Sequence, residues 1–213
     1  AGNTSTPAGN VSSAPDKTST PGSTSTPEVT VIPTVEPTEE PAPEKTVIYP
    51  SKEFDEAQEA EEPFNVVIKD GTEELYSGDI GRACSYIYSI SIPASVTLID
   101  SGFIDDLKTC ERLRKITVDS ENTVYDSRDN CNAIIQKESN NLLVGCAGST
   151  IPASVTSIDR DAFSGCKGLK QISIPASVTD IDGYLFSDCT GLKQVSIAEG
   201  ITSIGENAFR GCS

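Results

Sequence analysis

The sequence predicts a mainly β solenoid with an embedded β-hairpin, preceded by a disordered tether rich in Pro, Thr, Ser and Glu. From Ile151 onward the chain repeats every 23 residues, because the hexapeptide Ile-Pro-Ala-Ser-Val-Thr at 151–156 returns at 174–179. Cysteines keep the same interval at Cys166, Cys189 and Cys212. A fixed period of this size is typical of repeat proteins, in which each unit buries its apolar face against its neighbours.

Residues 1–50 are the predicted tether. They hold nine of the thirteen prolines together with ten Thr and six Ser, and such a composition cannot bury enough apolar surface to fold. Residues 51–63 form an acidic linker that joins the tether to the repeats. Within it, residues 51–62 form either a short acidic helix that ends before Pro63 or a solvated run of charge.

The solenoid is expected over residues 64–213, and residues 166–189 show one complete unit. The alternation Ile172-x-Ile174 predicts a short strand with one buried face. Pro175 ends that strand, since it has no amide hydrogen for a ladder bond. Phe186 is expected to fill the interior before Cys189 opens the next unit.

Earlier units are less regular. Residues 84–100 keep the pattern, about three residues are inserted near 103–107, and Phe64–Ile68 is expected to be an atypical first unit. The period breaks between Val118 and Ile151. There, 132–136 and 141–145 flank a polar turn and predict a β-hairpin within an island of about residues 119–150. A structural island that covers the core is favoured over a functional insertion.

Seven cysteines are present. Stacked units repeat every ~4.8 Å, whereas bridged Cβ atoms lie about 3.8 Å apart with a defined twist. In-phase cysteines are therefore expected to be buried thiols rather than disulfides. Cys131 and Cys146 lie outside the phase and are either bridged or free.

Charge and composition exclude several classes of protein. A net charge of −16 argues against a nucleic-acid partner, and no apolar run reaches the length of a membrane span. The lack of histidine removes His-based catalysis, and without a CxxC motif it argues against a transition-metal site. Residues 126–130 lack the Gly and the distal Glu of a calcium loop. We therefore expect no enzyme, no cofactor and no metal.

Binding through a surface is the better expectation. Residues that alternate with buried Ile and Val face outward and line up from unit to unit as hydroxyl, amide and basic columns. The candidate ligand-binding residues are Tyr88, Arg114, Lys170 and Lys193 at the edge, Lys115, Gln171 and Gln194 beside them, and Ser173 and Ser196 further along.

The pattern Ile-Pro-x-Ser-Val-Thr-x-Ile, followed by Ala162-Phe163 and Cys166, resembles the BspA-like leucine-rich repeat family of surface proteins from mucosal anaerobes and some protozoa. Residues 125–135 resemble an element that recurs in that family, so the resemblance covers about 64–213. It implies a right-handed leucine-rich-repeat solenoid on a secreted or cell-surface protein. It also implies adhesion, or binding of a protein or glycan on a host or bacterial surface, and supplies no catalytic motif.

Two alternatives remain open. The repeats are a passive structural spacer, or they are an accessory region of a larger surface enzyme. The chain is also expected to be truncated at its C-terminus, because Cys212 and Ser213 are followed by no polar cap.

Overall fold

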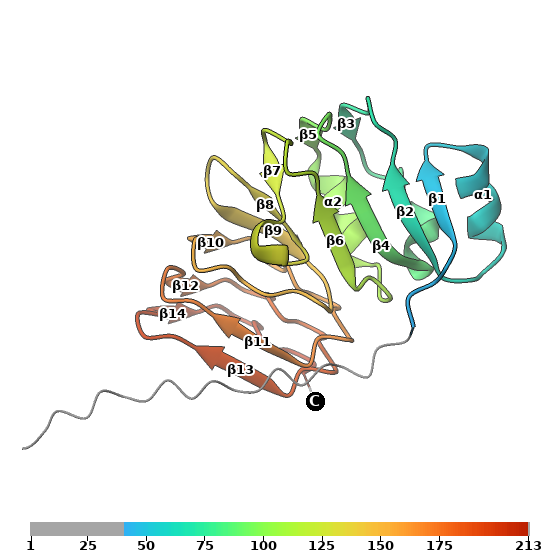
Figure 1. The fold of residues 1–213 in the computed structure, drawn as a ribbon. Coiled ribbons are helices and arrows are strands. Elements are labelled where there is room, and N and C mark those ends of the chain that lie inside the picture. Colours follow the sequence, from blue (N-terminus) through green and yellow to red (C-terminus); the bar gives the residue numbers. More distant parts are fainter. Residues whose placement is uncertain (1–40, 213) are drawn as a thin grey trace, which may run out of the picture. The chain divides into compact units, whose positions relative to one another are not determined.

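The computed structural model describes residues 41–212, so residues 1–40 of the predicted tether lie outside the described residues. The described part is mostly strand with few helices, as predicted (Figure 1). In chain order its elements are β1 (Thr46–Tyr49), α1 (Lys52–Glu59), β2 (Phe64–Ile68), β3 (Glu74–Leu75), the 3-10 segment Gly81–Ser85, β4 (Ile87–Ile92), β5 (Leu98–Ile99), α2 (Ser101–Lys108), β6 (Lys115–Val118), β7 (Tyr125–Asp126), the 3-10 segment Arg128–Asn130, β8 (Ala133–Gln136), β9 (Asn141–Gly145), β10 (Ser157–Ile158), β11 (Gln171–Ile174), β12 (Asp180–Ile181), β13 (Gln194–Ile197) and β14 (Ser203–Ile204).

Ordered structure begins earlier than the sequence indicated. β1 lies inside the range assigned to the tether and pairs in parallel with β2, with Val47 opposite Val66. Phe64–Ile68 is therefore the second strand of its sheet rather than the first unit. β1 forms because residues 46–49 include apolar side chains that can join the core. Val47 is only 3% exposed and packs in the same core as Phe64.

Of the two possibilities for residues 51–62, the helix is the one that forms. Ser51 caps α1, because its hydroxyl accepts a hydrogen bond from the Phe54 amide at 3.2 Å. Phe54 and Ala57 are buried on one side of the helix. Two apolar residues at i and i+3 thus anchor an otherwise acidic segment against the core.

The insertion predicted near 103–107 forms part of α2. The Asp100 carboxylate accepts a hydrogen bond from the Phe103 amide at 2.7 Å and so caps this helix. Phe103, Ile104 and Leu107 are buried. The extra residues therefore allow a helix where later units have turns.

The predicted hairpin is confirmed. β8 and β9 pair antiparallel, with Ile134 opposite Val144 and Gln136 opposite Asn141. Its neighbouring side chains enter different cores: Ile134 packs with the core around β1, β2, β4 and β6, whereas Ile135 packs with the core of the later units. Successive strand residues point to opposite faces, so the hairpin divides two hydrophobic cores.

The later units show the 23-residue period directly. β11 pairs in parallel with β13, with Ile172 opposite Val195, and β12 pairs in the same way with β14. Inside, the rings of Phe163, Phe186 and Phe209 stack with centroids 5.4 Å apart at each step. An aromatic column thus runs through the interior of three successive units.

The last unit has no neighbour among the described residues on its outer side. Ile197 and Ile204 are 43% and 57% exposed, whereas their counterparts one unit earlier, Ile174 and Ile181, are 1% exposed. The same sequence positions are therefore buried only where another unit follows. The right-handed solenoid itself stays a prediction.

All seven cysteines are free. The Cys189 thiol donates to the carbonyl of Phe163 at 3.0 Å, and the Cys212 thiol donates to that of Phe186 at 3.1 Å. Each of these two thiols thus bonds to the backbone carbonyl of a Phe in the aromatic column instead of to another sulfur. Cys131 and Cys146 are buried and unbridged, while Cys166, which we expected to be buried, is half-buried.

Candidate functional site

The outward positions of the strands form columns, as the alternation predicted. Ser89 lies opposite Lys115, and Gln171 lies opposite Gln194. Of the nine candidate residues, those that are exposed are Lys115, Lys170, Ser173, Lys193 and Gln194, and those that are half-buried are Arg114, Gln171 and Ser196.

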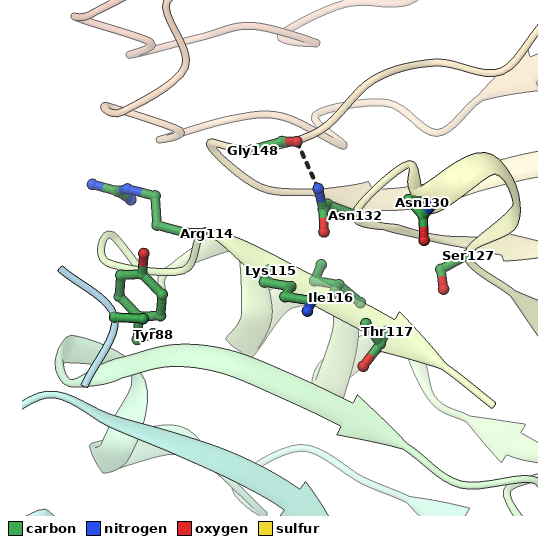
Figure 2. Close-up of a pocket in the computed structure, with 10 residues that line it drawn as sticks. Tyr88, Arg114, Lys115, Ile116, Thr117, Ser127, Asn130, Asn132 and Gly148 are labelled. Atoms are coloured by element: carbon green, nitrogen blue, oxygen red, sulfur yellow. Dashed lines mark hydrogen bonds between the residues drawn. The ribbon is translucent and has the colours of Figure 1, made fainter. Parts of the chain in front are cut away.

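Tyr88 is the exception. It was expected to face outward, but it is 7% exposed. Burial of a Tyr ring is favourable when its hydroxyl keeps a polar neighbour. The ring still lines the edge of a hollow beside Arg114 (Figure 2).

The strip that the sequence predicted is divided into two parts. β6 and β11 belong to different sheets, and residues 148–151, which fall one period before β11, form no strand. There the Gly148 carbonyl accepts a hydrogen bond from the Asn132 side chain at 2.9 Å. This segment thus bonds to the hairpin region, which separates Tyr88, Arg114 and Lys115 from the six candidate residues on or beside β11 and β13.

The segment around Gly148 packs closely against the Arg114 backbone, and this contact requires a glycine. A Cβ atom on Gly148 would lie 2.3 Å from the Arg114 carbonyl oxygen. On the other side of Arg114, its guanidinium lies over Gly168, where a Cβ would approach Nη2 to 2.9 Å. The Lys170 ammonium lies over Gly191 in the same manner, at 3.0 Å. At two places in the array a basic side chain thus packs over a glycine of a later unit.

The first hollow, which we call the basic hollow, has a volume of about 460 Å³ and lies at the start of β6 (Figure 2). Arg114 and Lys115 line it from the strand side, and Ser127, Asn130 and Asn132 line it from the island. None of the described residues that line it is acidic. Because the whole chain carries a net charge of −16, this lining of two cations and no carboxylate is a local reversal of sign.

The second hollow, the acidic hollow, has a volume of about 490 Å³ and lies at the other end of the same strands. Its charged lining residues are Asp70, Asp119 and Glu121, all exposed. Among its described lining residues none is basic. Thr117 of β6 lines both hollows, so the two adjoin at this residue.

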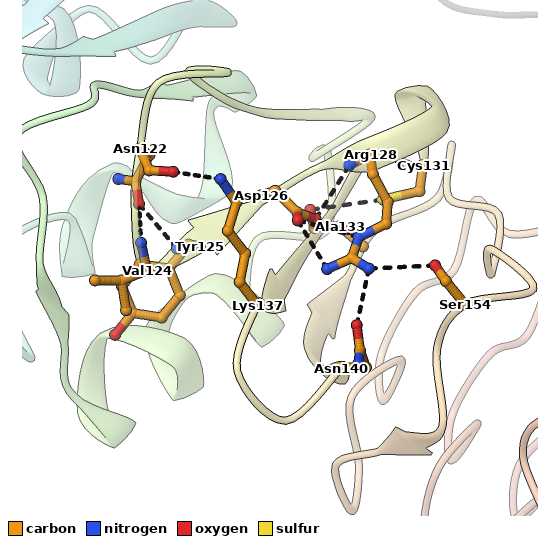
Figure 3. Close-up of polar contacts among 10 residues, drawn as sticks. All are labelled: Asn122, Val124, Tyr125, Asp126, Arg128, Cys131, Ala133, Lys137, Asn140 and Ser154. Atoms are coloured by element: carbon orange, nitrogen blue, oxygen red, sulfur yellow. Dashed lines mark hydrogen bonds and ion pairs between the residues drawn. The ribbon is translucent and has the colours of Figure 1, made fainter.

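A network around Arg128 holds parts of the island together and joins it to Ser154 of the later units (Figure 3). The guanidinium pairs with Asp126, with Nε 2.9 Å from Oδ1 and Nη2 2.8 Å from Oδ2. Nη1 also donates to Asn140 at 2.8 Å and to Ser154 at 3.3 Å. The hydrogen bond with Asp126 raises the pKa of Arg128. Since both Asp126 oxygens are occupied, the turn at 126–130 presents an ion pair rather than a set of calcium ligands.

Asn122 supplies a second anchor, which the sequence analysis missed. It is fully buried, and its amide nitrogen donates to the carbonyls of Pro93 and Val96. Its carbonyl oxygen accepts from the amides of Val124 and Tyr125 (Figure 3). One side chain thus joins the unit of β4 to the start of the island. A lone Asn in a loop carries no signal of such a role, because its partners lie 26 and 29 residues away.

The site offers recognition groups rather than reactive ones. Within residues 41–212, no three Cys, Asp or Glu side chains gather as a metal site, and no helix there is long and apolar enough to cross a membrane. Burial raises the pKa of Cys131 and of Cys146 to about 11, and that of Cys189 to about 12. These thiols therefore stay protonated and poorly nucleophilic near neutral pH.

Cys84 differs from the other cysteines. A hydrogen bond with Cys110 lowers its pKa. The Cys84 side chain is nevertheless buried and lines neither hollow. It is therefore not part of the candidate site.

Comparison with known families settles the nature of the C-terminal units. Residues 144–213 match the model of the BspA type leucine-rich repeat region, in six copies. These residues are BspA-type leucine-rich repeats. The match covers the units that carry Lys170 and Lys193, and Phe163, Phe186 and Phe209 of the aromatic column also lie within the matched residues.

Solved structures extend the similarity to the fold of about 70% of the chain. A leucine-rich repeat protein from Eubacterium ventriosum is 24% identical with a TM-score of 0.50, over 71% of this chain and 46% of that one. A leucine-rich cell surface protein from Faecalibacterium prausnitzii is 24% identical with a TM-score of 0.52, over 70% and 45%. The pneumococcal vaccine antigen PcpA is 16% identical with a TM-score of 0.54, over 70% and 37%.

At these identities the similarity concerns the fold alone. The chain spans less than half the length of each of these three proteins. A search of curated proteins finds no match.

Proposed function

We propose that this chain is part of a non-catalytic, secreted or cell-surface repeat protein that binds a protein or a glycan through the outward faces of its strands. The observation that carries this proposal is the strand face of β2, β4 and β6, on which two hollows bear charged groups. Among the ion pairs found within residues 41–212, none involves Lys115, Asp119 or Glu121. Charged groups at exposed, concave positions promote association and specificity.

The BspA-type repeats support an extracellular or cell-surface location, because one structural relative is described as a cell surface protein and another as a vaccine antigen. Extended arrays of stacked units provide long surfaces, which is how repeat proteins of other families bind their ligands.

A passive spacer is the second candidate. One observation favours it: β11 and β13 present Gln, Ser and flanking Lys side chains to water and no aromatic residue, although aromatic residues dominate strong binding sites. The spacer proposal predicts that charge reversals on the strands leave attachment unchanged.

Surface attachment distinguishes the two candidates. The double variant Lys170→Glu with Lys193→Glu and the single variant Lys115→Glu are compared with the native chain on a surface coated with sialylated mucin glycans. The matched control is Lys52→Glu with Arg210→Glu, which reverses two exposed charges away from the strands. We expect binding by the native chain and the control, weaker binding by the strand variants at low salt, and a smaller difference at high salt because exposed charges are screened. Equal attachment of all variants at low salt would support the spacer.

A further inference from the structure

The strand face of β2, β4 and β6 is polarised along the strand direction. Lys115 and Arg114 line the hollow at the beginning of β6, and Asp119 and Glu121 line the hollow at its end. The two hollows meet at Thr117, which lies halfway between Lys115 and Asp119 in the sequence. We call the surface formed by these two adjoining hollows the polarised groove.

The charges of the groove stand apart from the chain's internal ion pairs. Three cations elsewhere are neutralised directly: Lys108 pairs with Asp161, Lys167 with Glu111, and Arg128 with Asp126. Lys115 lies in none of the ion pairs found within residues 41–212, and Arg114 donates to the backbone carbonyls of Glu111 and Leu113. The cationic end of the groove is therefore available to a ligand carboxylate.

The acidic end is available in the same way. Asp70 accepts a hydrogen bond from the Gly71 amide, and Asp119 accepts one from the Glu121 amide. These bonds orient the carboxylates without neutralising them. Lys69 is exposed nearby but does not line the acidic hollow.

The floor between the two ends is weakly polar. The hydroxyls of Ser91 and Thr117 bond to each other at 2.9 Å, so they satisfy one another. Val67 beside them is 37% exposed, and Ile48, paired with it on β1, is 47% exposed. The floor can therefore contact an apolar side chain, while the charged ends determine what binds and in which orientation.

The spacing of the charges sets the length of the ligand. Lys115 and Thr117 lie on the same face of β6, and Asp119 directly follows the strand, where its amide donates to the Ile92 carbonyl and continues the ladder. At ~3.3 Å per residue the two charged positions are roughly 13 Å apart. An extended peptide places residues i and i+4 on one face at this same distance. An opposite pair of charged residues at i and i+4 would therefore reach both ends of the groove at once.

We propose that the polarised groove binds an extended peptide segment of a partner protein that carries an acidic and a basic side chain four residues apart. Acidic glycans carry charge of one sign, so they complement the basic end and are repelled by the acidic end. A peptide can carry both signs. This inference rests on the proposed binding function and names the chemistry of the ligand at that face.

The geometry also determines the mode of binding. The Ser127 hydroxyl accepts a hydrogen bond from the Val118 amide at 2.9 Å, so the island occupies part of the free edge of β6. A peptide that added itself as a further strand would have to displace the island. The ligand therefore lies across the outward side chains and is recognised by its charges rather than by backbone pairing.

An array of acetylated and amidated peptides tests the proposal with the full chain. One set carries Asp and Lys at positions i and i+4, in both orders, with the three intervening residues varied. Matched sets carry Asp at both positions, Lys at both positions, or Asp and Lys adjacent with the same composition. An oligogalacturonate is included as an acidic glycan. We expect the mixed i, i+4 set to bind more tightly than each other set at low salt.

Charge-exchange variants make the test specific. Lys115→Glu should lower affinity for the mixed set roughly fivefold, which corresponds to the loss of one exposed ion pair, and should shift preference toward the Lys-Lys set. Glu121→Lys with Asp119→Lys should shift preference toward the Asp-Asp set. Combining the three changes should restore binding of the mixed set, and this rescue excludes misfolding as the cause of the single losses.

Three outcomes would overturn the inference. The first is an array in which the mixed set binds no better than the other sets. The second is an acidic-end variant that binds the peptides like the native chain. The third is a native chain that binds no peptide. If the oligogalacturonate binds and only Lys115→Glu weakens it, the peptide inference fails while the proposed binding function stands. If the chain also fails to attach to the mucin surface, both fail.

Discussion

Replacing Phe186 by Ala tests how the BspA-type repeats are held together. Phe186 is fully buried, and its ring stacks on Phe163 and on Phe209 with centroids 5.4 Å away on both sides. Loss of a buried Phe side chain costs about 3–5 kcal/mol. We expect the upper part of that range, because the rings on both sides lose a stacking partner and the surrounding core cannot collapse into the space.

Phe209→Ala is the matched control. Phe209 belongs to the same column but is half-buried and stacks on one side only among the described residues, so its loss should cost about half as much. Phe186→Leu is a second control that keeps most of the volume, and it should cost less than about 1.5 kcal/mol.

The assay is hydrogen exchange read by mass spectrometry, combined with urea unfolding. Because the hairpin divides two cores, Phe186→Ala should accelerate exchange in the peptides of β11–β14 and leave those of β2, β4 and β6 unchanged. Equal costs for Phe186→Ala and Phe209→Ala would show that the column does not stabilise the repeats in proportion to its packing. Faster exchange in both cores would show that they are one cooperative unit.

Two further predictions concern buried polar groups. The Cys189 thiol ionises at about 12 when folded but near 9 when unfolded, so its contribution to stability should be constant below pH 9 and fall between pH 9 and about 12, where rising pH favours the unfolded chain. The free energy of unfolding measured from about pH 8 to 12 checks this, and a Cys189→Ala variant should show a weaker fall. Asn122→Ala should destabilise the chain by about 2–4 kcal/mol, because it removes the partner of the buried Val96 carbonyl and Tyr125 amide and of the half-buried Pro93 carbonyl and Val124 amide. Urea unfolding measures this, and the variant Thr123→Ala, at the exposed neighbouring position, should stay near zero.

The strands and interior positions of the repeat units could be predicted from the sequence, because they follow from local alternation and from the repeat period. Alternation at Ile172 and Ile174 predicted β11, and the recurrence of Phe and Cys predicted positions that the structure places in an interior column. Each inner unit packs against an equivalent neighbour, so equivalent positions are buried wherever another unit follows, as Ile174 and Ile181 are. The same spacing predicted free thiols for the in-phase cysteines, whereas the state of Cys131 and Cys146, which are also free, had been left open.

The non-equivalent parts were harder to place. β1 was assigned to the tether, because four residues among prolines carry no period, and only packing of Val47 against the core shows that they belong to the sheet. α2 depends on a capped insertion that the sequence indicated only as extra length. The candidate strip was predicted as one surface, yet the hairpin divides it.

The repeat, its 23-residue period, the hairpin and the outward side chains of each strand could be predicted from the chain alone, since these features depend on residues close together in it. Packing in three dimensions was needed to show that the hairpin separates two cores, that Tyr88 is buried, and that Lys115 and Glu121 line adjoining hollows at opposite ends of one strand face. Those features arise where segments without a common repeat meet, and contacts between non-equivalent segments depend on packing that no local pattern encodes.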